Sequence, residues 1–450
     1  MEISNASGYN GVQLNDCKSM LMRSIFRPLA VLTLALSLTA CGTIKRPEGP
    51  LRLTDGRSPI THAQAQSSVD ARITNFLTEF GTLMSDGTPT NILALSGGGA
   101  NGAYGGGLLV GWTEAGNRPQ FDIVTGVSTG ALAAPFAFLG PEWDDKLTEA
   151  YTSGQSDNLI GLRTFSAIFN PSLFSSKRLH LLVDSYVTPE LLAAVAAEHA
   201  KGRRLLVATT NLDTEESVIW DMGRIASSND AGAKELFKSV LVASASIPGV
   251  FPPVLLPSLT PEGEVVLEMH VDGGVNTPYL AVPEGLMLWT TKRPLSELGG
   301  GALYVVVNGQ TGRNTGTTPG SISGILTRTY DSMSKASLRT HLAVTSGFAR
   351  RNGLHLSFSA IPDNVHASAL AFDQQSMTAL FDLARQRARD GSAWLRLDEH
   401  DPTTDFIPSN EVFVSDIPPA LMAPTETPEP DEAPSDAAND NEPSESLNFG

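Results

Sequence analysis

Short apolar runs alternate with longer helix-like stretches through most of the chain. Five runs have the length and the β-branched character of buried strands. They are Asn91 to Leu95, Ile123 to Thr125, Leu205 to Thr209, Val265 to Val271 and Leu303 to Val307. Late in the chain, Met377, Leu380, Phe381 and Ala384 recur at helical spacing, which is typical of a core-facing helix. This alternation predicts an α/β sandwich with a largely parallel central sheet.

An apolar run near the N-terminus has a different explanation. Residues 29–36 are apolar, follow Arg23 and Arg27, and precede Leu38-Thr39-Ala40-Cys41. A basic start, an apolar run too short to span a bilayer and a small-residue site are the pattern of a secretory signal. The last four residues resemble the bacterial lipobox, in which the cysteine is lipidated and becomes the new N-terminus. We therefore expect a lipid anchor at Cys41.

The same region predicts where the protein is located. Gly42, rather than aspartate, follows the cysteine, and by analogy with enterobacterial sorting this favours the outer membrane of the bacterial envelope. The acidic residues in the first 19 positions make a poor start for a signal, so we expect translation to begin at Met20 or Met22. Residues 1–40 are then the signal peptide.

Composition divides the rest of the chain. Residues 41–71 are rich in Pro, Thr, Gln and Ser and indicate a tether, and residues 418–450 form an acidic, Pro-rich tail without Lys or Arg, predicted to be disordered. The catalytic domain is expected at residues 72–417. The formal net charge of −17 argues against a nucleic-acid partner. The two cysteines, Cys17 and Cys41, provide no disulfide framework and no cysteine-based zinc site.

Candidate chemistry begins at Gly126-Val127-Ser128-Thr129-Gly130. This Gly-x-Ser-x-Gly motif follows a predicted strand and precedes the helix-like Ala131 to Ala134. A strand-to-helix turn of this kind exposes a serine for acyl transfer, and the helix N-terminus favours developing negative charge. The competing interpretation of the motif alone is a flexible loop. Pro135 lies far enough into the helix to kink it.

Two further segments fit the same chemistry. Ser96 to Gly107 is rich in glycine and fits either the G-x-G-x-x-G dinucleotide fingerprint or an oxyanion hole. The dinucleotide interpretation is the weaker one, because Asp122 opens its strand, whereas the ribose-binding acid closes one. Asp272, in Val271-Asp272-Gly273-Gly274, ends an apolar strand and is a candidate base for Ser128, although Asp-Gly-Gly alone is more often a turn.

These three blocks in this order resemble the signature of patatin-like phospholipases, over about residues 90–280. The segment Ala243 to Pro253 adds to the resemblance. It implies a three-layer α/β/α fold and a lipid acyl hydrolase that needs no metal or other cofactor. It also implies Ser128 as nucleophile, Asp272 as base and the amides of Gly97, Gly98 and Gly99 as the oxyanion hole. The expected partner is then a phospholipid or another acyl ester.

Two positions depart from the family pattern. The chain has Asn101 where the family usually has Arg or Lys, and Ser96 where it often has Asp. The missing cation puts the anchoring of the loop, or its attraction for phosphate, in question. The glycine amides remain.

Three alternatives stay open from the sequence. One is an α/β-hydrolase with a Ser-His-Asp triad, for which the histidine candidates are His270, His341, His355, His366 and His400. The second is a lipid-binding envelope lipoprotein without turnover. The third, a metal-dependent phosphodiesterase, lacks a paired ligand motif.

Overall fold

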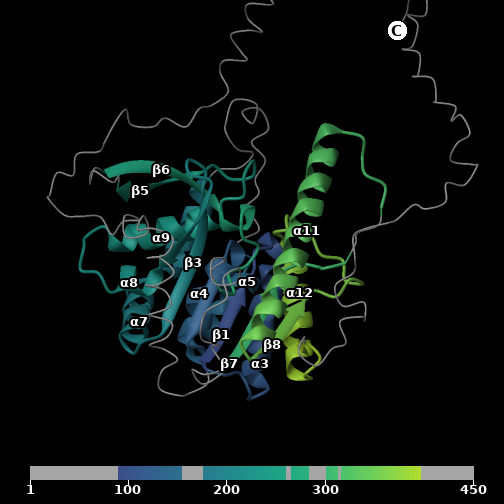
Figure 1. The fold of residues 1–450 in the computed structure, drawn as a ribbon, viewed down its shortest axis with the longest axis horizontal. Helices are drawn as coiled ribbons and strands as arrows, with labels where there is room; N and C mark the ends of the chain where they lie inside the picture. Colours follow the sequence, from purple (N-terminus) through teal and green to yellow (C-terminus); the bar gives the residue numbers. More distant parts are fainter. Residues whose placement is uncertain (1–89, 155–175, 260–264, 283–300, 313–315, 397–450) are drawn as a thin grey trace, which may run out of the picture. The chain divides into compact units, whose positions relative to one another are not determined.

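The computed structural model describes residues 90–154, 176–259, 265–282, 301–312 and 316–396 (Figure 1). All of them belong to one structural unit, Met1–Pro408, and the second unit, Ser409–Gly450, lies outside the described residues. The predicted signal peptide, Cys41, the tether and the C-terminal tail also lie outside them. The signal peptide, the lipid anchor, the tether and the disordered tail therefore stay predictions from the sequence.

The described residues form one nine-stranded mixed sheet in the order β5-β6-β3-β2-β1-β7-β8-β9, with β4 paired to β3 (Figure 1). The five central strands, from β3 to β8 in that order, are parallel. Strands β4, β5, β6 and β9 join by antiparallel pairing. The strands are β1 (Thr90–Leu95), β2 (Ile123–Val127), β3 (Arg204–Asn211), β4 (Glu216–Asp221), β5 (Val254–Leu259), β6 (Val265–Asp272), β7 (Gly301–Val307), β8 (Leu354–Ala360) and β9 (Leu395–Arg396).

Helices cover both faces of this sheet. The helices are α3 (Gly102–Glu114), α4 (Thr129–Leu139), α5 (Asp144–Thr152), α6 (Ser176–Tyr186), α7 (Pro189–Ala200), α8 (Met222–Ala226), α9 (Ala233–Ser244), α11 (Ile322–Arg351) and α12 (Gln374–Arg389), with short 3-10 turns at η2 (Gly99–Asn101), η3 (Pro141–Trp143) and η5 (Gly273–Val275). Among the described helices none is long and apolar enough by itself to cross a membrane. Lys177–Tyr186 and Pro189–Ala200 pass that test only together, with a bend of 65° between them.

Strand β1 shows how the two layers of core arise. Its side chains alternate, so Leu93 and Leu95 pack into the core under α3, α4 and α12, whereas Ile92 and Ala94 face the opposite side. On that side α11 contributes Leu338, Leu342 and Phe348 to a second core. Both clusters are buried, which confirms the predicted three-layer α/β/α architecture. The sheet is less parallel than expected, because its edge strands reverse direction.

Only part of the glycine-rich segment is a loop. From Gly102 onward it forms α3, which packs against α12. A Cβ at Gly107 would lie 2.0 Å from the carbonyl oxygen of Phe381, so any larger residue would separate the two helices. The predicted core helix is confirmed in α12, where Met377, Leu380, Phe381 and Ala384 are buried.

The C-terminal end of α4 is held by two buried arginines. The helix continues through Pro135 to Leu139, and its last carbonyl groups need hydrogen-bond donors from outside the helix. Arg118 Nη2 donates to the Ala137 oxygen at 3.1 Å and Arg203 Nη2 donates to the Phe138 oxygen at 2.6 Å. Positive charge at this end also interacts favourably with the helix dipole. The C-terminal end of α4 is therefore fixed to the domain.

The environment of Arg203 predicts a large loss of stability on its removal. Its Nη1 donates to Glu198 Oε2 at 2.7 Å and its Nε to the Phe121 oxygen at 2.7 Å. In Arg203→Met we expect the free energy of unfolding, measured by urea denaturation, to fall by about 3 kcal/mol, because buried acceptors lose their donors. Lys201 pairs with the same Glu198 but its side chain is 66% exposed, so Lys201→Met should cost less than about 1 kcal/mol. Equal losses in the two variants would contradict this account.

Candidate active site

Ser128 lies at the junction of β2 and α4 with its backbone in an uncommon conformation. Its φ is 57° and its ψ is −127°, outside the regions that a side chain normally allows, and such a residue costs about 1–3 kcal/mol. The turn packs closely against the end of β1: a Cβ at Gly130 would lie 2.4 Å from the Leu95 oxygen. The two motif glycines therefore serve the turn that the sequence predicted, and Ser128 stands at the N-terminus of α4.

The strained turn is held by a hydrogen bond from the other side. The Ser128 amide donates to Ser244 Oγ at 3.0 Å, and Ser244 Oγ donates in turn to the Ala208 oxygen on β3 at 2.7 Å. The Ser128 carbonyl accepts the Ala131 amide at 2.9 Å, as the first bond of α4. Ser244 ends α9, so this helix positions the serine although sequence reasoning assigned it no role.

Asp272 is brought to Ser128 by the order of the strands. Strand β3 lies between β2 and β6, and Thr209 of β3 pairs with Asp272 while Ala208 pairs with Val127. Ser128 Oγ consequently donates to Asp272 Oδ2 at 2.5 Å. The Gly274 amide donates to Asp272 Oδ1 at 2.7 Å, which fixes the carboxyl group in this direction. Residues 144 positions apart thus meet as the sequence analysis expected.

Burial dominates the electrostatics of this pair. Ser128 is 4% and Asp272 is 2% exposed. Loss of solvation raises the pKa of Asp272 from 3.8 to about 7, against the opposing effect of the hydrogen bonds from Ser128 and Gly274. A carboxyl group with a pKa near neutrality is suited to accept a proton from a serine and to return it.

The glycine-rich turn lies directly beside Ser128. A Cβ at Gly97 would lie 3.1 Å from Ser128 Cβ. Of the three amides predicted as oxyanion donors, that of Gly97 donates to the Pro278 oxygen at 3.2 Å. The amides of Gly98 and Gly99 have no acceptor among the described residues. Of the three, the Gly97 amide is therefore already engaged within the protein, and its close contact with Ser128 brings the turn to the serine.

A buried asparagine holds this turn in place. Asn308, which directly follows β7, donates from Nδ2 to the Ser96 oxygen and from its amide to Ser96 Oγ, both at 2.8 Å. Its Oδ1 accepts the Gly105 amide of α3 at 2.9 Å. Ser96 Oγ donates to the Gly97 oxygen at 2.7 Å. Ser96, which departs from the family pattern, is therefore part of the clamp, and no sequence motif marks Asn308.

The histidines that the sequence left open do not meet Ser128 in the described part of the chain. His270 shares a strand face with Asp272 but its Nδ1 lies 3.0 Å from Thr209 Oγ1, and its ring packs edge-on against Trp220. His341 Nδ1 lies 2.9 Å from the Ser337 oxygen on α11. His355 and His366 are exposed, and His400 lies outside the described residues. No described histidine is hydrogen-bonded to Ser128 or Asp272.

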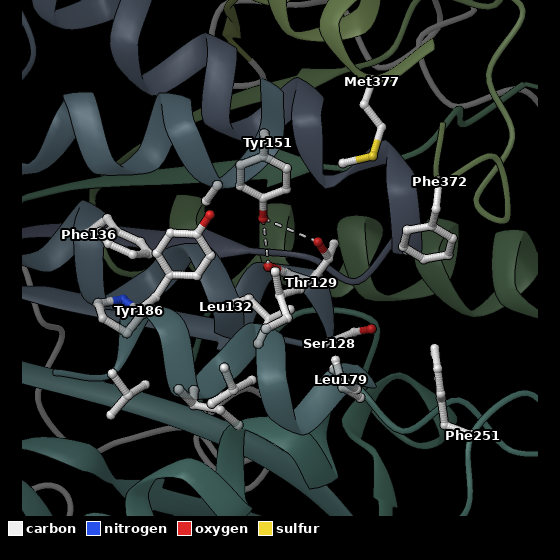
Figure 2. Close-up of a pocket in the computed structure, with 18 of the residues that line it drawn as sticks. Ser128, Thr129, Leu132, Phe136, Tyr151, Leu179, Tyr186, Phe251, Phe372 and Met377 are labelled. Atoms are coloured by element: carbon white, nitrogen blue, oxygen red, sulfur yellow. Dashed lines mark hydrogen bonds between the residues drawn. The ribbon is translucent and has the colours of Figure 1, made fainter. Parts of the chain in front are cut away.

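An apolar cavity opens beside Ser128, with a volume of about 870 Å³ that includes its opening to solvent (Figure 2). Figure 2 shows Ser128 between the rings of Phe136 and Tyr186 on one side and those of Phe251 and Phe372 on the other. None of the described residues that line it carries a charged side chain. The Tyr151 hydroxyl donates to the Thr129 oxygen at 3.2 Å, and burial raises the pKa of Tyr151 to about 12, so it stays neutral. The cavity therefore suits an apolar group attached to whatever Ser128 attacks.

Part of the chain matches a known protein family. Residues 93–282 match the family model described as patatin-like phospholipase. Among solved structures, the chain is similar to VipD from Legionella pneumophila, with 14% identity over 68% of each chain and a TM-score of 0.28. A search of curated proteins found no match.

The buried carboxyl group predicts how stability depends on pH. Between about pH 4 and 7 Asp272 keeps its proton in the folded chain and loses it in the unfolded chain, so the free energy of unfolding falls as pH rises. Asp272→Asn removes this penalty. We expect the stability of the variant relative to wild type to increase by about 1.4 kcal/mol per pH unit from pH 4 to 7, and to become constant above pH 7.

Urea denaturation at several pH values measures this difference. Ser128→Ala is the matched control, because it keeps Asp272 buried: its free energy of unfolding should still fall between pH 4 and 7, and loss of the Ser128 hydrogen bond should extend that fall to higher pH. Parallel stability profiles for wild type and Asp272→Asn would contradict the raised pKa.

Proposed function

We propose that this chain cleaves fatty-acyl esters through a Ser128–Asp272 dyad, because residues 93–282 match the family model of patatin-like phospholipases, which supports lipid acyl hydrolase activity in general. The observation that carries the proposal is the 2.5 Å hydrogen bond from Ser128 Oγ to Asp272 Oδ2 in a buried site. A serine is a weak nucleophile until a base accepts its proton, and the carboxylate is the one base that Ser128 contacts among the described residues.

The proposed reaction has two steps. Asp272 accepts the proton of Ser128 Oγ while the oxygen attacks the ester carbonyl, and the alcohol leaves with that proton. Water then attacks the acyl-enzyme, with the same carboxylate as base, and the fatty acid is released. The Gly98 and Gly99 amides stabilise the oxyanion in both steps, and each such donor typically lowers the barrier by about 3 kcal/mol. Every step uses groups of this chain and water.

The proposal includes a phospholipid or a related acyl ester as substrate. A phospholipase A or lysophospholipase reaction fits a mainly apolar cavity that is lined in part by Ser128. The anchor at Cys41 and the outer-membrane location stay predictions from the sequence. They would place Ser128 near its substrate, since two or more acyl chains hold a protein on a membrane stably.

Hydrolysis by matched variants tests the dyad. Fatty-acid release from phosphatidylethanolamine, lysophosphatidylethanolamine and a p-nitrophenyl ester is compared for wild type, Ser128→Ala, Asp272→Asn and His270→Gln. We expect kcat/KM to fall at least about 1000-fold in the first two, because nucleophile and base act as a unit. His270→Gln should stay within about threefold, because His270 contacts Thr209 and not the dyad.

Two results would contradict the proposal. Loss of activity in His270→Gln with activity retained in Asp272→Asn would favour a histidine as base. If wild type neither hydrolyses any of these esters nor reacts at Ser128 with a fluorophosphonate probe, the chain is a lipid-binding protein without turnover.

The pKa of Asp272 predicts the pH profile of the reaction. The base must be ionised, and its pKa is raised to about 7, so kcat/KM should increase with pH through a midpoint near 7 and become constant at higher pH. Stopped-time assays with the neutral p-nitrophenyl ester, whose own ionisation does not change, measure the midpoint. A profile that is flat between pH 5 and 9 would contradict Asp272 as the base.

A further inference from the structure

Two helices line the part of the cavity that leads from Ser128 to the rings of Phe136 and Tyr186. Helix α4 provides Leu132 and Phe136, which are four residues apart and therefore lie on one helical face, and Ser128 directly precedes this helix. Helix α6 provides Leu179, Val183 and Tyr186 at similar spacing. In Figure 2, Leu179 lies close to Ser128. This part of the cavity is thus a channel between two helical faces that leads from Ser128 to Phe136 and Tyr186.

An aromatic pair marks the other end. The rings of Phe136 and Tyr186 are 6.0 Å apart and nearly perpendicular, at 84°. Phe136 also packs against Trp143, with ring centroids 6.4 Å apart. Phe136 is 3% exposed, so the ring has little freedom to move away from the channel. A rigid aromatic contact at this position limits how far a linear group attached to Ser128 can extend.

We propose that α4 sets the acyl-chain length of the substrate, with Leu132 at mid-channel and the Phe136–Tyr186 contact as the limit. This inference rests on the proposed hydrolysis at Ser128. Eight residues of helix separate Ser128 from Phe136, or about 12 Å at 1.5 Å per residue. An extended chain advances about 1.2 Å per bond, as the polypeptide backbone does, so about ten carbons fill the channel.

The lining of the channel supports an acyl chain as its occupant. With no charged side chain among the described lining residues, a phosphate or another ionic headgroup would lose its hydration without compensation there. Each buried methylene instead gains free energy from leaving water. The chain of the acyl group therefore enters the channel, and the polar part of the ester stays at the Ser128 end.

A series of p-nitrophenyl esters from C4 to C16 tests the limit. For wild type, kcat/KM should rise roughly fourfold per methylene up to about ten carbons and then stop rising. Leu132→Phe fills the middle of the channel and should move the optimum to shorter chains. Tyr186→Ala should move the optimum at least two carbons longer.

Two controls separate this inference from the proposed function. Tyr186→Phe keeps the ring and should keep the wild-type optimum, and Leu181→Ala, on the exposed side of α6, should also leave it unchanged. If the esters are cleaved but neither Leu132→Phe nor Tyr186→Ala moves the optimum, the length limit is wrong while the hydrolase proposal survives. Absence of hydrolysis of every ester, C4 included, would instead contradict the proposed function.

Discussion

The backbone conformation of Ser128 is the constraint on which the site depends. A non-glycine residue with φ 57° and ψ −127° is unfavourable by itself, so the surroundings must hold it. Gly130 fits against the end of β1, Ser244 of α9 accepts the Ser128 amide, and two arginines hold the opposite end of α4. The turn presents Oγ to one carboxyl group and to the glycine-rich turn. Relaxation of the turn would move the nucleophile away from both.

The buried carboxyl group connects this geometry to chemistry. Asp272 sits in a dry site where ionisation is costly, and this cost raises its pKa to about 7. The group thereby becomes a usable base near neutral pH, and the folded chain gives up stability for that property. The apolar channel on the other side of Ser128 has no charged side chain among its described lining residues. One dry region therefore accounts for both the proposed base and the proposed selectivity for an acyl chain.

Much of the fold could be predicted, because apolar strands and motif glycines leave strong local signals. All five predicted strands are present, and the three blocks lie together beside Ser128. What the sequence did not reveal depends on distant partners. Asn308 is an ordinary residue after a strand until β7 lies beside β1, and Ser244 is one of several serines until α9 meets the Ser128 turn. The hydrogen bond from the Gly97 amide to the Pro278 oxygen likewise joins residues that are far apart in the sequence. Short antiparallel edge strands such as β9 were missed because two residues carry no periodicity.

The central claim is that Ser128 forms a covalent acyl-enzyme with Asp272 as its base. Mass spectrometry of peptides from protein quenched during turnover of a p-nitrophenyl ester measures this directly. The account predicts one acyl adduct, on the peptide that contains Ser128, which is absent in Ser128→Ala and strongly diminished in Asp272→Asn. Turnover with the acyl group on another residue, or an undiminished Ser128 adduct in Asp272→Asn, would contradict it.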